Sequence, residues 1–152
     1  MLHSGGLGWA FLPLLIQASD QWESELTLVL QGRFKDSRDL GLPKENVKLT
    51  SIVLPSEVMK YATSSADVGL LLYDQDSPEE ARKGNTAGKL RLNLSCGLPI
   101  ICCNLDVFRW VEKEKCGVWV SDVSLIEEAV KKIMNSYETY HHNAIRVFNE
   151  RF

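Results

Sequence analysis

Short runs of mainly apolar residues recur along the chain and are separated by polar stretches. Continuous apolar runs of this length are typical of strands that are buried on both faces of a parallel sheet. The pattern predicts strands at Met1–Ser4, Leu26–Gln31, Val47–Ser51, Val68–Tyr73, Pro99–Cys103 and Gly117–Val120.

Between these runs, apolar positions recur every three or four residues, as they do on one face of a helix. One such stripe holds Val58, Tyr61, Ala62 and Ser65. Strands that alternate with helices over the whole chain predict an α/β fold, a Rossmann-like parallel sheet with helices on both faces. The predicted helices are Trp9–Ala18, the segment from Pro55 to Ala66, Val107–Glu114, Val123–Met134 and a last one that starts at Tyr137 and carries the surface histidines His141 and His142.

The segment from Lys89 to Leu94 can be interpreted in two ways. Its apolar and polar residues alternate with period two, which is the pattern of a strand. The turn Gly97-Leu98-Pro99 and the apolar run after it favour a helix instead, because the order of strands and helices is then unbroken. We therefore predict a helix that starts near Ala87 and ends at this turn.

The start of this helix has the composition of an anion site. Small residues let the backbone approach a ligand, and the first N–H groups of a helix attract negative charge. Lys89 adds a cation where the helix dipole alone would favour an acid. We predict that the hydroxyl of Thr86, the N–H groups of Ala87 and Gly88, and the ammonium of Lys89 bind the diphosphate of a nucleotide-sugar. The alternative is an ordinary helix start that is exposed to solvent and binds no ligand.

The phosphate-loop motif of ATPases fits this segment poorly. That motif has four residues between its first glycine and the Gly-Lys pair, followed by Ser or Thr. Three residues separate Gly84 from Gly88 here, and Leu90 follows Lys89. The sequence therefore argues against an ATPase site.

Other candidate residues follow predicted strands, where ligands bind in parallel sheets. Gly5 and Gly6 are either a second phosphate-facing loop or a flexible turn, and Arg33 is either a phosphate partner or a surface residue. Asp74 and Asp76 resemble a metal-binding pair of carboxylates, but acids are common in solvated loops, and Lys89 can neutralise phosphates without a metal. We predict no metal site and no cofactor.

Composition narrows the classes of function. The chain has 152 residues, which predicts one domain over 1–152, and a formal net charge of −3, which gives no support for nucleic-acid binding. No apolar run is long enough to span a bilayer, and the start has no features of a signal peptide. Four cysteines without a C-x-x-C spacing are typical of reduced thiols in a cytoplasmic protein.

Three segments together resemble a known family. They resemble the carboxy-terminal, donor-binding domain of GT-B glycosyltransferases, of the group-1 (glycogen-synthase-like) type that builds surface polysaccharides. The resemblance covers nearly the whole chain and is carried by Ala66–Tyr73, Asn85-Thr86-Ala87-Gly88-Lys89-Leu90 and Ser95-Cys96-Gly97-Leu98-Pro99-Ile100-Ile101.

The resemblance implies half of a GT-B fold. Such a domain binds a nucleoside-diphosphate sugar, most simply of the UDP type, and transfers the hexose to a glycan or lipid-linked acceptor. A separate amino-terminal half binds the acceptor, so a chain without that half is expected to be inactive. The full-length enzyme is expected in the cytoplasm, with the inner membrane face as a further location.

By the same resemblance, residues can be assigned roles position by position. Lys89 contacts the donor diphosphate and is the catalytic candidate, and Gly5 and Gly6 approach the same phosphates. The turn Ser51-Ile52-Val53-Leu54 meets the base.

Many family members also carry two glutamates separated by seven residues, and those positions are Gly84 and Leu92 here. This departure leaves open the alternative of a non-catalytic nucleotide-sugar-binding or assembly module.

Overall fold

The six strands form one parallel sheet in a computed structural model, which describes residues 1–4, 11–32, 44–50, 55–73, 88–103 and 105–152. The strand order is β3-β2-β1-β4-β5-β6. This is the order of a Rossmann fold, with its switch point between β1 and β4. The predicted fold class is confirmed. The strands are β1 (Leu2–Ser4), β2 (Leu28–Gln31), β3 (Val47–Thr50), β4 (Gly69–Leu72), β5 (Ile100–Cys103) and β6 (Gly117–Val120).

The described helices follow the predicted order along the chain. Pro13 lies in the first turn of its helix, where its missing N–H has no intrahelical acceptor to lose. The helices are α1 (Phe11–Ala18), α2 (Ser56–Ser64), α4 (Gly88–Ser95), α5 (Trp110–Lys113), α6 (Ile126–Met134) and α7 (Tyr137–Arg151), with short 3-10 turns η1 (Ser19–Gln21), η4 (Asp106–Phe108) and η5 (Val123–Leu125).

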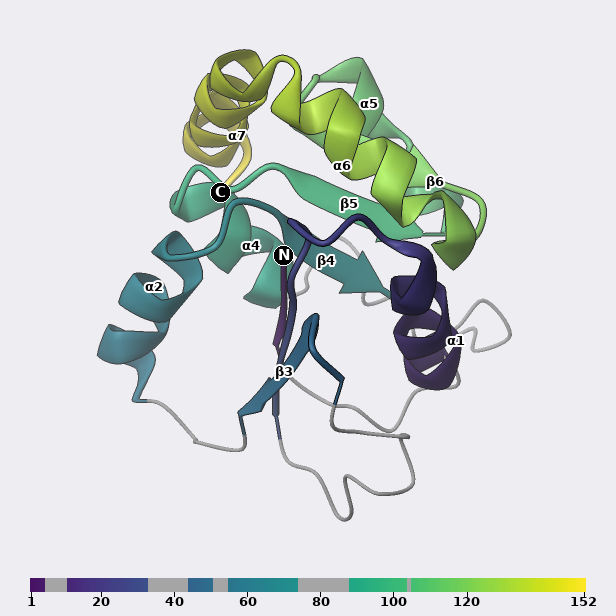
Figure 1. The fold of residues 1–152 in the computed structure, drawn as a ribbon. Helices are drawn as coiled ribbons and strands as arrows, with labels where there is room; N and C mark the ends of the chain where they lie inside the picture. Colours follow the sequence, from purple (N-terminus) through teal and green to yellow (C-terminus); the bar gives the residue numbers. More distant parts are fainter. Residues whose placement is uncertain (5–10, 33–43, 51–54, 74–87, 104) are drawn as a thin grey trace.

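Alternate residues of the central strands enter two separate cores. Leu70 and Leu72 of β4 pack in a cluster with residues of α1 and α6, whereas Leu71 and Tyr73 pack in a second cluster with residues of α4, α5 and α7. Because a strand turns successive side chains to opposite faces, this division places the two groups of helices on the two faces of the sheet. Figure 1 shows α1 on one side of the sheet and α2 and α4 on the other.

The segment that the sequence left ambiguous is a helix. Leu90 and Leu94 of α4 are buried, and the helix ends with two hydrogen bonds. The N–H of Gly97 donates to the carbonyl of Leu94 at 3.0 Å, and the N–H of Leu98 donates to that of Asn93 at 2.9 Å. Gly97 has φ +71°, a left-handed conformation that glycine adopts at little cost. This cap ends α4 and turns the chain into β5.

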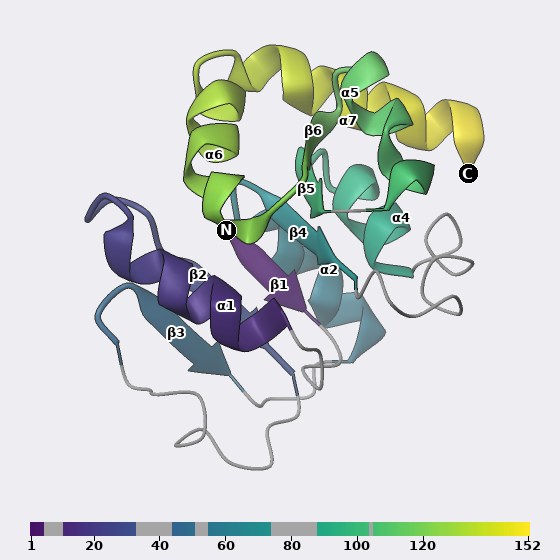
Figure 2. The same cartoon turned by 90° about the vertical axis from the view of Figure 1, so that its right-hand side faces the viewer.

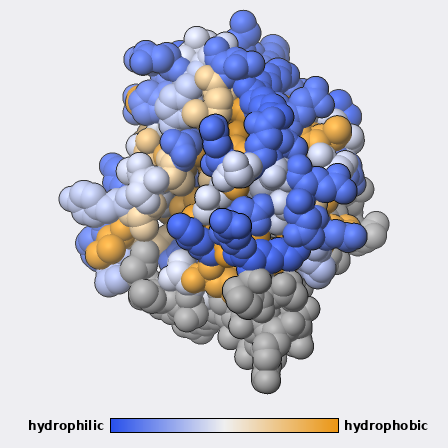
Figure 3. Space-filling view, viewed as in Figure 1, coloured by the Kyte–Doolittle hydropathy of each residue, from blue (hydrophilic) through white to orange (hydrophobic). Residues whose placement is uncertain are grey.

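The buried face of α2 differs from the predicted stripe. Val58 and Tyr61 are 42% and 79% exposed, whereas Thr63 is fully buried. The helix packs against α4, which covers part of its surface. Apolar surface is visible over α2 in Figure 3, on a face that is otherwise mainly hydrophilic. The spacing of apolar residues identified the helix but not which of its faces is buried.

The described cysteines agree with the prediction of reduced thiols. Cys96, Cys102 and Cys116 are thiols rather than halves of a disulfide, and the last two are buried. Burial raises the pKa of the Cys116 thiol to about 12, with a smaller contribution from the negative charge of Glu114. The thiol is therefore protonated at neutral pH, as expected of a core residue rather than a nucleophile.

Candidate functional site

The start of α4 lies at the edge of the sheet where the parallel strands end. Tyr73 directly follows the last residue of β4, and the Nζ atom of Lys89 lies 5.6 Å from the centroid of its ring. This contact places the first turn of α4 beside the carboxyl end of β4, next to the switch point with β1. Figure 2 shows β1, β3 and β4 running in the same direction, with α4 beside β4. Ligands of open α/β sheets bind at this edge.

Lys89 is held against an aromatic stack. The residue is half-buried and its Nζ atom is shielded from solvent. The ring of Tyr73 stacks on that of Phe108, with centroids 5.6 Å apart and planes 27° from parallel. The face of an aromatic ring attracts a cation, so the stack favours the observed position of the ammonium.

The first turn of α4 is open and carries no acid. Gly88 is exposed, and among the described residues no atom lies within 4 Å of the point where its Cβ would stand. The first N–H groups of a helix have no acceptor within it. N–H groups, the positive end of the dipole and the ammonium of Lys89 therefore lie in the same turn, a combination that favours negative charge beside it.

Most of the other predicted site residues lie outside the described residues. Their roles stay predictions, although in the sequence they come directly after the ends of β1, β2 and β3 and just before α4. Of the predicted diphosphate group, the structure describes Gly88 and Lys89, which are neighbours in the first turn of α4. The undescribed residues are Gly5, Gly6, Arg33, Ser51, Ile52, Val53, Leu54, Thr86 and Ala87.

Of the two positions where many family members carry a glutamate, and of the acidic pair after β4, the structure describes one residue. Leu92 is half-buried in α4, and Gly84 lies outside the described residues, as do Asp74 and Asp76. Within the described part of the chain, no three His, Cys, Asp or Glu side chains are grouped closely enough to bind a metal ion. The absence of a metal ion at the loop after β4 stays a prediction.

Tyr73 and Phe108 are site residues that sequence reasoning missed. Tyr73 is the last residue of a predicted strand and precedes a polar loop. An aromatic residue at such a position could have been recognised from the sequence as a candidate site residue. Phe108 lies in η4, which follows β5, and reaches Tyr73 only because β4 and β5 are neighbours. No local pattern marks it.

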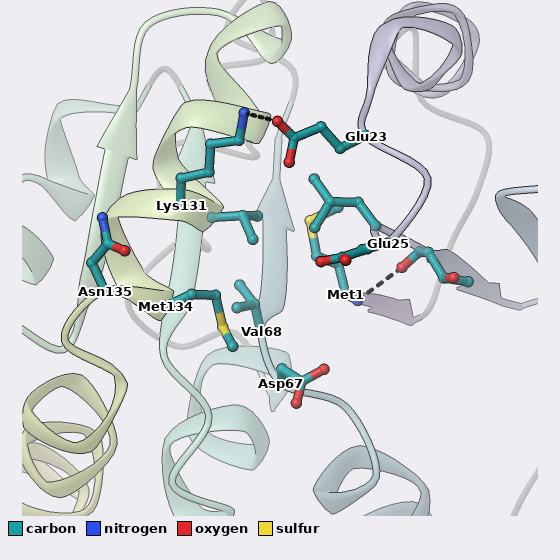
Figure 4. A pocket seen from close by; sticks show the side chains of 11 residues that line it. Met1, Glu23, Glu25, Asp67, Val68, Lys131, Met134 and Asn135 are labelled. Atoms are coloured by element: carbon teal, nitrogen blue, oxygen red, sulfur yellow. Dashed lines mark hydrogen bonds and ion pairs between the residues drawn. The ribbon is translucent and has the colours of Figure 1, made fainter.

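A cavity of about 450 Å³ opens at the opposite edge of the sheet (Figure 4). Asp67 and Glu25 line it, and the Nζ atom of Lys131 forms an ion pair with Glu23 at 2.8 Å. The hydrogen bonds that Lys131 donates to Glu23 and, with a smaller effect, to Glu127 raise the pKa of Lys131. Because this cavity lies where the strands begin, it is far from the edge at which α4 starts and is not part of the candidate site.

Comparison with known proteins gives a family match over most of the chain. Residues 16–150 match the family described as glucosyltransferase 3-like, C-terminal domain. No curated protein matches the chain significantly. In the described residues, no helix has both the length and the apolar character that crossing a bilayer requires.

Solved structures share the fold at low sequence identity. WaaG, a glycosyltransferase involved in lipopolysaccharide biosynthesis, is 18% identical with a TM-score of 0.64, and the match covers 97% of this chain and 42% of WaaG. HepE of Anabaena, solved in complex with UDP-glucose, is 14% identical with a TM-score of 0.69, and the match covers 99% of this chain and 44% of HepE. The chain thus spans less than half the length of each of these structures.

Proposed function

The chain belongs to the family of glucosyltransferase 3-like C-terminal domains, and we propose on that premise that it is the donor-binding half of a glycosyltransferase. Its ligand is a nucleoside-diphosphate sugar, and the reaction transfers a hexose to a glycan or lipid-linked acceptor. More specifically, the proposed donor is a UDP-sugar and the proposed role is in surface polysaccharide synthesis.

The position of Lys89 is the observation that carries the proposal. Its ammonium lies beside the carboxyl end of β4 and in the first turn of α4, where the helix N–H groups have no acceptor within the helix. A diphosphate is the part of a nucleotide-sugar that this combination of charge and N–H donors recognises.

The same arrangement suits the chemistry of transfer. When the glycosidic bond breaks, negative charge develops on the departing diphosphate. Oriented donors and a fixed cation stabilise such charge without moving during the reaction. Lys89 and the start of α4 can do this without a metal ion, and Lys89 is accordingly the proposed catalytic residue.

The relatives support a sugar donor and a second domain. HepE was solved with UDP-glucose, and WaaG acts in lipopolysaccharide biosynthesis. Since this chain matches 42% and 44% of those proteins, we propose that an amino-terminal domain supplies the acceptor site. The 152-residue chain alone is then expected to bind the donor and to show no sugar transfer.

A titration of UDP into the chain and its variants tests the proposal. Lys89→Ala is expected to weaken binding by about 1–3 kcal/mol, the cost of one charge-assisted contact. Lys60→Ala is the matched control, because Lys60 is also a helical lysine but is exposed on α2. Equal affinity of the unaltered chain and Lys89→Ala would contradict the proposed site.

A non-catalytic nucleotide-sugar-binding module is the second candidate. Leu92 favours it, because this apolar residue of α4 stands where many relatives of the group-1 type carry a glutamate. Both candidates predict that UDP binds. Sugar transfer by the chain joined to an acceptor-binding half would favour the enzyme, and its absence with intact UDP binding would favour the module.

A further inference from the structure

We propose that the cavity of about 450 Å³, at the edge of the sheet where the strands begin, is the docking site of the segment that joins this domain to its acceptor-binding half. That segment meets the domain at Met1 and places an apolar side chain and a lysine or arginine in the cavity. The proposal rests on the proposed function, which includes the acceptor-binding half, and it adds an interaction surface away from the donor site.

Met1 is bonded into the sheet, although β1 starts at Leu2. Its nitrogen donates to the carbonyl of Thr27 at 2.9 Å, and its carbonyl oxygen accepts from the N–H of Val29 at 2.9 Å. Bonds to residues on either side of the facing position are the pattern of a parallel pair of strands. A residue joined to Met1 would therefore continue the line of β1 outward, at the edge where the cavity opens.

The nitrogen of Met1 occupies a position that suits a peptide N–H better than an ammonium. Burial lowers the pKa of this ammonium below its ordinary value of 8.0, with a smaller and opposite effect from the negative charge of Asp67. The lowered pKa means that the folded chain disfavours the charged form. A peptide N–H has no charge and can donate the same hydrogen bond to Thr27, so a segment joined here removes that cost.

The cavity is lined by both apolar and acidic side chains. Val68 and Val130 are buried, whereas Met134 is an apolar side chain that is 47% exposed. Glu25 and Asp67 are exposed, and neither forms an ion pair with another side chain in the described part of the chain. Figure 4 shows Glu25, Asp67 and Met134 around the same opening.

This lining determines the kind of segment that fits. An apolar side chain of the segment would cover Met134 and remove its surface from water. A basic side chain would stand beside Glu25 and Asp67, in place of the charge that the amine of Met1 loses when it is joined. Lys131 does not fill this role, because its Nζ atom is already paired with two glutamates at 2.8 and 3.1 Å.

Extensions of the 152-residue chain that differ only in charge test the proposal. Leu-Lys-Lys, Leu-Gln-Gln or Leu-Glu-Glu is added before Met1, and unfolding by urea is measured. The lysine extension is expected to raise the urea midpoint by about 0.2–0.5 M over the glutamine extension, and the glutamate extension to lower it. Equal midpoints for all extensions would overturn the proposal.

Charge removal at the cavity shows whether the added lysines act there. In a chain with Glu25→Gln and Asp67→Asn, the difference between the lysine and glutamine extensions is expected to vanish. Glu128→Gln is the matched control and should leave the difference in place, because Glu128 is an exposed acid of α6 that lines a different cavity. A difference that survives the loss of Glu25 and Asp67 would overturn the proposal, since the lysines would then act on the net charge of the chain.

The methyl resonance of Met134 reports on the apolar contact. It is expected to shift when the chain carries the Leu-Lys-Lys extension. The methyl resonances of Leu125, which is 40% exposed in η5, are expected to stay in place. An unmoved Met134 resonance would overturn the placement of the segment in the cavity.

UDP binding by the same chains separates this proposal from the proposed function. The cavity lies at the opposite edge from the start of α4, so the extended chains are expected to bind UDP as the unaltered chain does. Equal urea midpoints together with UDP binding that depends on Lys89 would overturn the docking site alone. Midpoints that follow the charge of the extension in a chain that binds no UDP would overturn the donor site and support the docking site.

Discussion

The imidazole of His141 occupies the space that a side chain at residue 97 would need. A Cβ on Gly97 would lie 2.4 Å from the Cε1 atom of His141, and the Nδ1 atom of His141 lies 2.8 Å from the carbonyl oxygen of Gly97. The ring of Tyr137 stacks on His141, with centroids 6.0 Å apart. Helix α7 is thereby attached to the carboxyl end of α4, the helix whose opposite end carries Lys89.

Gly97→Ala is expected to destabilise the chain by about 2–4 kcal/mol. The new methyl group would meet the His141 ring, and alanine is unfavourable at the φ of +71° that this position requires. Unfolding by urea, followed by circular dichroism, measures the loss.

Gly88→Ala is the matched control for this substitution. Gly88 is the first residue of the same helix, and no described atom lies within 4 Å of its missing Cβ. The free energy of unfolding of the Gly88→Ala variant is therefore expected to stay within about 0.5 kcal/mol of that of the unaltered chain. Equal stability of both alanine variants would contradict the tight contact between Gly97 and His141.

The pH dependence of stability is expected to include a contribution from Asp122. Hydrogen bonds from the side chain and then the backbone of Ser124 hold the pKa of Asp122 below its ordinary value of 3.8. A depressed carboxylate pKa in the folded state means that stability is present above about pH 4 and is lost as the pH falls through the folded pKa.

Asp122→Asn tests this contribution without removing the cap. The N–H of Ser124 donates to Oδ1 of Asp122 at 2.8 Å, and an asparagine offers the same acceptor but does not titrate. Urea unfolding at pH 7 and pH 2.5 is expected to show a smaller acid-induced loss for Asp122→Asn. Asp122→Ala, which lacks the acceptor, should be about 1 kcal/mol less stable than the unaltered chain at pH 7. Identical pH profiles for the unaltered chain and Asp122→Asn would refute this contribution.

Two substitutions in α2 test which of its faces is buried. Tyr61→Ser is expected to change the free energy of unfolding by less than about 0.5 kcal/mol, since its side chain is 79% exposed. Thr63→Asp places a charge at a fully buried position and is expected to cost at least about 2 kcal/mol. Thermal unfolding measures both. A larger loss of stability for Tyr61→Ser than for Thr63→Asp would support the buried face that the sequence predicted.

Part of the candidate site could be predicted from local sequence. The combination of Gly88, Lys89 and the turn at Gly97 indicates a helix start with a cation and a helix end, because capping and turn chemistry depend on adjacent residues. The structure has that helix and places its first turn at the carboxyl edge of the sheet. The aromatic stack beside Lys89 could not be predicted, because Phe108 lies in the connection after β5 and stacks on Tyr73 only in the folded chain.

The sequence by itself determined the α/β class, the order of the strands and helices, and the chemistry at the start of α4. These follow from the period of apolar residues and from turn residues, which act within a few positions along the chain. Only the tertiary structure decided which side of α2 is covered, that His141 packs on Gly97, and that the ring of Tyr73 contacts both Phe108 and Lys89. Those contacts join residues that are far apart in sequence, and they form only when the helices pack on the two faces of the sheet.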